Sequence, residues 1–147
     1  MRDGHQIEAK MMAVLDRKPS LRQKYSRPGQ KAKRLYKPDI IHPQDNENGC
    51  EEVCGNQMAV LVQHRGRRED EDNPAIHYGV IESADRLMRN ATIRDAIVKE
   101  KGVLCFEMEA AGLTNRFPCL VVRSIYDYSD SHKSRQWQGY AAMTAAA

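Results

Sequence analysis

The sequence predicts an α/β fold in which a layered mixed sheet is flanked by helices. Strand-like and helix-like segments alternate over residues 74–147, as in proteins whose helices cover a sheet. Residues 118–125 form a near-continuous apolar run, typical of a strand that is covered on both faces. The 147 residues include two Phe and one Trp, so a core of this fold would be mainly aliphatic.

The beginning of the chain is predicted to be helical over residues 5–17. Its apolar residues recur at helical spacing, at Ile7, Met11, Val14 and Leu15. Pro19 should stop or restart the helix, and a second short turn is expected around residues 21–25.

Residues 26–73 read as a long surface excursion. Proline and glycine recur along it, and a charge run occupies residues 65–72. One short strand is expected within it, at residues 58–62. A stretch of this length without regular structure is uncommon inside a compact domain, so we expect an insertion or a lid.

After Pro74 the pattern becomes β-α-β-α-β-α. Apolar strand-like runs alternate here with segments of helical periodicity, which places candidate ligand-binding residues at the carboxyl ends of the strands. The expected strands span residues 75–81, 103–106 and 118–125, and the expected helices span residues 85–101, 108–115 and 134–147.

The net charge of +3 is unevenly distributed. Residues 1–42 carry a net +7, residues 43–72 a net −5 and residues 73–147 a net +1. The basic stretch at residues 27–37 has the composition of a phosphate-contacting surface, but a solvated face is the better interpretation because no groove-reading motif accompanies it. Nucleic acid is therefore not the expected partner.

The four cysteines do not predict a metal site. Cys50 and Cys54 have a spacing that suits zinc, but no second close Cys or His pair supplies the remaining ligands. Cys105 and Cys119 lie in apolar runs and should behave as small hydrophobes in a reducing compartment. With a mean hydropathy of −0.70 and no apolar run long enough for a membrane span, we expect a cytoplasmic protein with no membrane partner.

Two carboxylates, Glu107 and Glu109, stand at the predicted junction between a strand and a helix. Carboxylates at this position commonly cap the exposed N–H groups of the helix, and they are equally able to face a ligand at the end of the strand. The small residues that follow, at 110–112, favour a close helix approach and a Glu109 that faces the strand-end crevice.

A second pair of carboxylates, Asp127 and Asp130, follows the last predicted strand. Ile125, Tyr126 and Tyr128 around Asp127 would desolvate its carboxyl group, which is the condition for a proton donor near neutral pH. For Asp130 a turn or a helix cap is the preferred interpretation.

Three motifs in this order resemble the nucleoside phosphorylase superfamily. They are IESAD at residues 81–85, FEMEAAG at 106–112 and VVRSIYDYSD at 121–130. The superfamily includes purine nucleoside phosphorylase, uridine phosphorylase and methylthioadenosine/S-adenosylhomocysteine nucleosidase. The variant of fungal multidomain proteins is the most similar, through EDNPAIHYG, DYSDSHK and WQGYAAM as well.

The resemblance implies a role for each matching residue. Glu109 would accept hydrogen bonds from the ribose hydroxyls, Met108 would pack against the sugar, and Asp127 would be the acid that assists departure of the base. The remaining substrate-binding positions would be Glu107 and Ser83, with Leu87 and Met88 lining the base pocket. Such residues act on the positive ribose and the negative leaving base of the transition state, so no metal or organic cofactor is needed and phosphate is a co-substrate.

The chain also departs from the family pattern. It has no Gly-rich phosphate loop, and Ala84, Ser124 and Tyr126 differ from the small residues usual at those positions. We therefore expect a fragment, namely the C-terminal part of a phosphorylase/hydrolase-like domain that lacks the N-terminal half.

The expected function is cleavage of the N-glycosidic bond of a nucleoside with phosphate or water. The alternative is a non-catalytic nucleoside-sensing or interaction module of a larger multidomain protein. The expected partners are nucleoside and phosphate, and the chain would form a homo-oligomer or belong to that larger protein.

Overall fold

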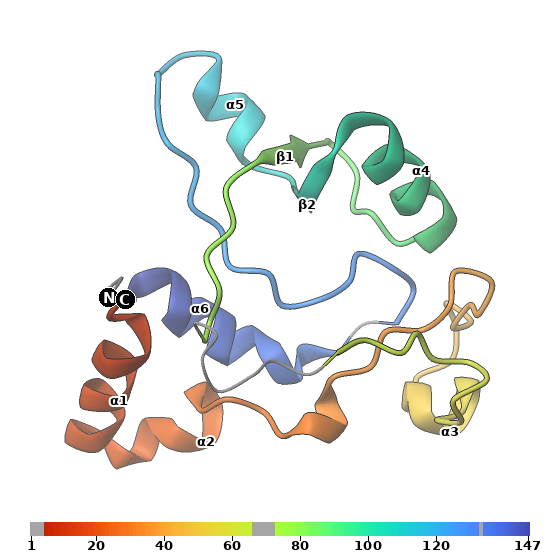
Figure 1. Cartoon of the computed structure of the whole chain (residues 1–147), viewed down its shortest axis with the longest axis horizontal. Helices are drawn as coiled ribbons and strands as arrows, with labels where there is room; N and C mark the ends of the chain where they lie inside the picture. The colour runs from red at the N-terminus through yellow and green to blue at the C-terminus, as the bar shows by residue number, and fades with distance from the viewer. Residues whose placement is uncertain (1–4, 66–72, 133) are drawn as a thin grey trace.

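The computed structural model describes residues 5–65, 73–132 and 134–147 (Figure 1). This part of the chain contains six α-helices and two strands. In chain order they are α1 (Ile7–Arg17), α2 (Arg22–Tyr25), α3 (Cys50–Cys54), β1 (Val80–Ser83), α4 (Ala91–Lys101), β2 (Val103–Glu107), α5 (Ala110–Thr114) and α6 (Gln138–Ala146). Short 3₁₀ turns occupy Pro19–Leu21, Gln30–Ala32 and Arg135–Trp137.

The two strands form a parallel pair joined by α4. Asn90 caps α4 by accepting the Ile93 N–H at 3.0 Å, which satisfies one of the free donors of the first turn. Gly102, with φ of 65°, ends α4 in the left-handed conformation that glycine adopts without strain, and β2 starts at the next residue. This local chemistry builds one β-α-β unit.

Helices α1, α2 and α6 form a separate group, in which α6 packs against α1 and α2 (Figure 1). Met11, Leu15 and Ala141 are its buried apolar side chains. Gly139 of α6 lies so close to the carbonyl oxygen of Lys24 that a Cβ atom would collide with it. The small residue is therefore what allows α6 to approach α2.

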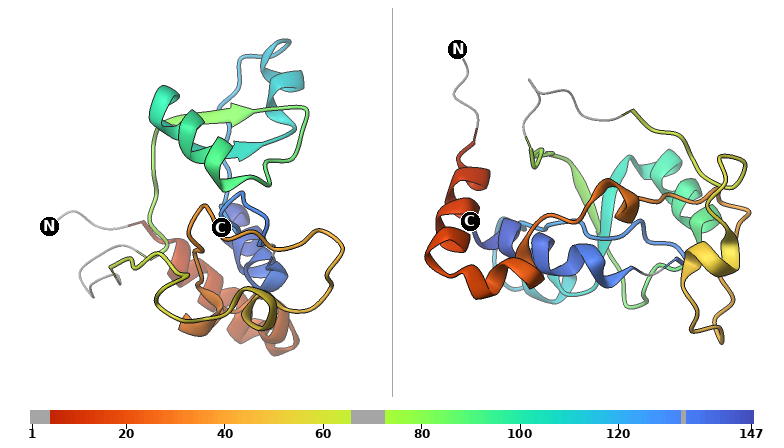
Figure 2. Two further views of the ribbon diagram at one scale, coloured as in Figure 1. Left: turned by 90° about the vertical axis from the view of Figure 1, so that its right-hand side faces the viewer. Right: turned by 90° about the horizontal axis from the view of Figure 1, so that it is seen from below.

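Figure 2 shows the strands with α4 and α5 on one side of the molecule and α1, α2 and α6 on the other. The indole of Trp137, just before α6, donates to the carbonyl of Ala32 at 3.0 Å and ties the irregular segment after α2 to this helical group. The described segments between the two groups are mostly without helix or strand.

Several predicted elements are confirmed, with shifted ends. The first helix, the short turn near residue 22, the strand that begins at Val103 and the last helix all form. The helix expected over residues 85–101 begins only at Ala91, because Asn90 is its cap. The strand expected over residues 75–81 is displaced to β1, and the helix expected over residues 108–115 shortens to α5.

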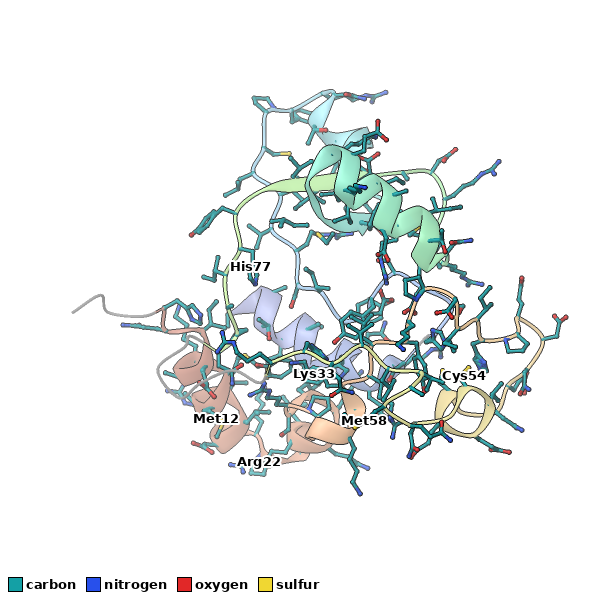
Figure 3. All side chains as sticks on the ribbon, turned by 45° about the vertical axis from the view of Figure 1, so that its right-hand side comes forward. Met12, Arg22, Lys33, Cys54, Met58 and His77 are labelled. Atoms are coloured by element: carbon teal, nitrogen blue, oxygen red, sulfur yellow. The ribbon has the colours of Figure 1, made fainter. Side chains whose placement is uncertain are left out.

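The prediction of a strand at residues 58–62 is wrong. This segment is a turn followed by a single antiparallel bridge between Leu61 and Tyr36. Met58, which is labelled in Figure 3, is 73% exposed. Helix α3 also forms within the excursion, at Cys50–Cys54, where the sequence analysis predicts no helix. Most of the predicted charge run lies at residues 66–72, outside the described residues.

The prediction of a doubly covered strand at residues 118–125 is also wrong. The run has no helix or strand assignment, and its Leu120 side chain is 90% exposed. An apolar run becomes a strand only when its backbone groups pair with a neighbour. Here β2 pairs with β1, and a cavity separates β2 from residues 122–127.

In the described part of the chain the longest helices have 11 residues. None of the helices there is long and apolar enough to cross a membrane.

Candidate functional site

A cavity of about 310 Å³ opens between the end of β2 and α6. Its walls are residues 105–107 of β2, the extended residues 122–127 with Ser129, and one face of α6 formed by Gln138, Ala141, Ala142 and Ala145. The volume is at the lower end of the range for small-molecule sites. The three alanines make most of the helix side apolar, with Gln138 as its polar residue, whereas the charged groups lie on the opposite walls.

Glu107 provides the buried carboxylate of the cavity. Its residue is 7% exposed, and it ends β2 immediately before α5. The carboxylate accepts the backbone N–H of Glu109 at 2.9 Å and that of Ala110 at 2.9 and 3.1 Å. The capping role considered for this carboxylate pair therefore belongs to Glu107.

The environment of Glu107 favours its ionised form. Burial on its own would raise the pKa of the carboxyl group. Hydrogen bonds from the Ser83 hydroxyl and from two backbone N–H groups, with the nearby charge of Arg123, outweigh the burial and lower the pKa to about 2. Glu107 therefore stays ionised in the cavity at neutral and mildly acidic pH.

Arg123 supplies the opposite charge. Its Nη2 lies 3.2 Å from Oε2 of Glu107 and also contacts Oε2 of Glu109. The guanidinium thus joins residues 122–127 to the start of α5. Sequence reasoning missed Arg123 as a site residue; the available signal was an arginine within an otherwise apolar run.

Glu109 and Met108 lie at the rim. The Glu109 side chain is 66% exposed and Met108 is 45% exposed, and neither belongs to the cavity wall. Glu109 occupies the N-cap position directly before α5, but its side chain makes no capping hydrogen bond. Its carboxylate is connected to the cavity through Arg123, so the two carboxylates of the motif have different positions and different partners.

Asp127 lines the cavity at the opposite end of the 122–127 wall and is half-buried. Its Oδ1 accepts the Ser129 N–H at 3.0 Å, which closes a tight turn in which Ser129 has φ of 54°. Burial and then the charge of Asp127 raise the pKa of the neighbouring Tyr126 hydroxyl, so that hydroxyl stays protonated and able to donate.

The remaining predicted residues are not on the cavity wall. Ser83 is half-buried at the end of β1, where its Oγ accepts the Ala111 N–H at 3.0 Å, so it supports the start of α5. Leu87 and Met88 lie in the loop between β1 and α4 and do not line the cavity. The structure therefore brings together Glu107, Asp127 and, at the rim, Glu109.

This arrangement suits a ligand with hydroxyl groups and an apolar ring. Carboxylates accept hydrogen bonds from hydroxyls, while the guanidinium of Arg123 donates to oxygen atoms. The apolar face of α6 offers a surface for a ring. Across residues 5–65, 73–132 and 134–147, no group of three His, Cys, Asp or Glu side chains is placed to hold a metal ion.

A comparison with curated proteins finds a relative in the fungus Hyaloscypha variabilis. It is named a nucleotide-binding leucine-rich repeat (NLR)-like protein, and it is 44% identical to this chain over 112 residues. The match covers 74% of this chain but 10% of the relative, so the chain spans about a tenth of that protein's length. No family model and no solved structure matches the chain. The sequence is thus similar to one segment of a much larger protein.

Proposed function

We propose that this chain is a nucleoside-binding module of a larger multidomain protein. The observation that carries the proposal is that Glu107, Arg123 and Asp127 share one cavity with the alanine-rich face of α6. In this proposal the ribose hydroxyls bind at the Glu107–Arg123–Glu109 end, and the base lies between α6 and Asp127. The match to a short segment of a far longer relative supports a role within a multidomain protein.

The proposal favours binding over turnover because of what holds Arg123. Arg123 is the cationic residue among those that line the cavity, and both Glu107 and Glu109 contact it. A phosphate ion entering here would have to compete with two carboxylates for the same guanidinium. Phosphorolysis is therefore less well supported than binding.

Cleavage of the N-glycosidic bond is the second candidate function, and one observation favours it. The Asp127 side chain lines the same cavity as the proposed ribose-binding end, and a carboxylic acid at this position would be the proton donor to a departing base. The similarity of the three motifs to the nucleoside phosphorylase superfamily supports the same candidate.

Two nucleosides that differ only in their hydroxyls test the proposed binding. Adenosine and 2′,3′-dideoxyadenosine are titrated into the chain by calorimetry. Because the carboxylates would bind the hydroxyls, adenosine should bind at least tenfold more tightly, as expected for the loss of hydrogen bonds to charged groups. Equal affinities, or binding of neither nucleoside, would contradict the proposal.

Turnover is tested by chromatographic release of free base from adenosine, inosine, methylthioadenosine and uridine, with and without phosphate. Release that falls by roughly 10²–10⁴ in Asp127→Asn would support the second candidate. Binding without release would leave the sensing or interaction module as the function.

A further inference from the structure

Three aromatic rings stack where residues 36–42 meet the turn at residues 128–132. Tyr36 is 1% exposed, and its hydroxyl donates to the carbonyl of Gly55 at 2.9 Å. Its ring lies 4.0 Å from that of His132, with planes 13° apart. The ring of His42 follows at 6.3 Å from His132, at 15°. The stack therefore joins two segments that are far apart in the sequence.

Polar contacts fix the stack on both sides. The backbone N–H of His42 donates to Oγ of Ser131 at 3.0 Å. The buried Asp130 carboxylate accepts the His132 N–H at 2.8 Å and lies 3.5 Å from its Nδ1, while Arg94 of α4 lies 3.8 Å from the other carboxylate oxygen. The preferred interpretation of Asp130 as a turn residue is thus confirmed.

Each imidazole has one buried nitrogen, Nδ1 of His42 and Nε2 of His132, with no hydrogen-bond partner in the described part of the chain. A neutral imidazole tolerates this arrangement better than a charged one, because a buried positive charge without a partner is costly. Burial and then the nearness of His132 lower the pKa of His42 below its ordinary value of 6.5.

We propose that the Tyr36–His132–His42 stack is an acid-sensitive latch. With His42 neutral, the latch holds residues 36–42 on the turn at 128–132. Adding a proton to His42 places a positive charge inside this buried contact, 6.3 Å from the ring of His132, and releases the segment. The inference goes beyond the proposed function, because it does not depend on what the cavity binds.

Charged and titratable groups surround the stack. The Asp130 carboxylate lies 3.5 Å from Nδ1 of His132, and Arg94 lies 3.8 Å from the other carboxylate oxygen. Burial and then the nearness of His132 oppose a charge on His42, so the folded chain resists protonation of that ring. The thiols of Cys50 and Cys54 on α3, near Tyr36, stay neutral because burial raises the pKa of both. The ion pair between Arg34 and Glu51 completes the charged surroundings of Tyr36.

The sign of the pH effect follows from the lowered pKa of His42. Folding favours the neutral ring, so the latch contributes its full stability above pH 6.5. This contribution is lost as the pH falls from 6.5 to the lower pKa of the folded chain. The folded-to-unfolded ratio should fall by roughly tenfold for each pH unit that separates the two pKa values.

The first test is an NMR titration of the histidine rings in the full chain. His42 should titrate below 6.5, and amide exchange at residues 36–42, corrected for the intrinsic pH effect, should accelerate between pH 7.5 and pH 5.5. A His42 ring that titrates at 6.5 or above would overturn the latch. So would an exchange rate that does not change across this range.

The second test compares urea unfolding of variants at the same two pH values. His42→Gln should lose less stability on acidification than the parent chain, because its side chain carries no titrating proton. His77→Gln is the matched control, since His77 is an exposed histidine on the segment that leads to β1, away from Cys54 of α3 (Figure 3). An acid loss in His42→Gln equal to that of His77→Gln would overturn the proposal.

His64 needs its own variant. Its ring lies edge-on to Tyr128 of the same turn, and burial followed by the charge of Lys33 lowers its pKa as well. In a chain that carries His64→Gln, adding His42→Gln should still reduce the loss of stability on acidification, as it does in the parent chain. If that reduction disappears, His64 and not the stack is the acid-sensitive group. Should His42→Gln fail to fold, the titration of the parent chain decides.

Discussion

Arg123 and Glu107 form an ion pair across the cavity, with Nη2 of Arg123 lying 3.2 Å from Oε2 of Glu107. The pair joins the extended residues 122–127 to the end of β2, although the two segments share no strand pairing. A buried carboxylate therefore has two tasks, since it caps α5 and anchors the opposite wall of the cavity.

The first prediction separates the two glutamates of the motif. Glu107→Gln should lower the free energy of unfolding by roughly 1–3 kcal/mol, because an amide replaces a buried charge that accepts backbone N–H groups. Glu109→Gln should lower it by less than about 1 kcal/mol, because its ion pair is exposed. Urea unfolding measures both variants. Equal losses would contradict the different roles assigned here.

The second prediction concerns acid. The pKa of Glu107 lies at about 2 in the folded chain, below its ordinary value of 4.5. Its stabilising contribution is therefore complete above pH 4.5 and is lost as the pH falls towards 2, for a total of roughly 3 kcal/mol. Glu107→Gln lacks this contribution, so the stability difference between the two chains should shrink over that range. If the stability difference between the parent chain and Glu107→Gln stayed constant from pH 6 to pH 2, the lowered pKa of Glu107 would be contradicted.

The third prediction concerns the charge that holds Glu107. Arg123→Gln removes the guanidinium but leaves the backbone hydrogen bonds to the carboxylate, so the pKa of Glu107 should rise from about 2 without returning to 4.5. Carboxyl-carbon NMR of the folded chain measures it. An unchanged pKa would show that Arg123 does not act on this group.

The fourth prediction tests the contact between α6 and α2. In Gly139→Ala the new methyl group would meet the Lys24 carbonyl, so the chain should lose about 1–3 kcal/mol of stability. Gly112→Ala is the matched control, because Gly112 is also helical and a Cβ there meets nothing within 4 Å. That change should be neutral or should stabilise by up to roughly 1 kcal/mol. Equal effects of both substitutions would contradict the close approach of α6.

Much of the secondary structure was predictable because its signals are local. The spacing of Met11 and Leu15 identifies one helix, and Gly102 marks the change from helix to strand. The strand predicted at residues 118–125 does not form, and the reason is not local. Its apolar residues suit a strand, but strand formation also requires a neighbour within hydrogen-bonding distance, which sequence pattern does not supply.

The candidate site was predictable only in part for the same reason. Glu107 and Asp127 stand where strands were expected to end, so their types and positions point to a site. The ion pair of Arg123 with Glu107 and the stacking of His132 on Tyr36 depend on how distant segments pack. No local sequence pattern predicts these contacts, because each joins residues that are far apart in the sequence.

The central claim is tested most directly by a substitution on α6 that fills the cavity, followed by a measurement of nucleoside binding. Ala142 lines the cavity, whereas Ala146, one turn later on α6, is also exposed but does not line it. Calorimetric titration with adenosine is compared for the parent chain, Ala142→Leu and Ala146→Leu. The proposed function predicts binding that Ala142→Leu weakens at least tenfold and Ala146→Leu leaves unchanged. Equal binding by all three chains, or binding by none, would contradict a nucleoside site in this cavity.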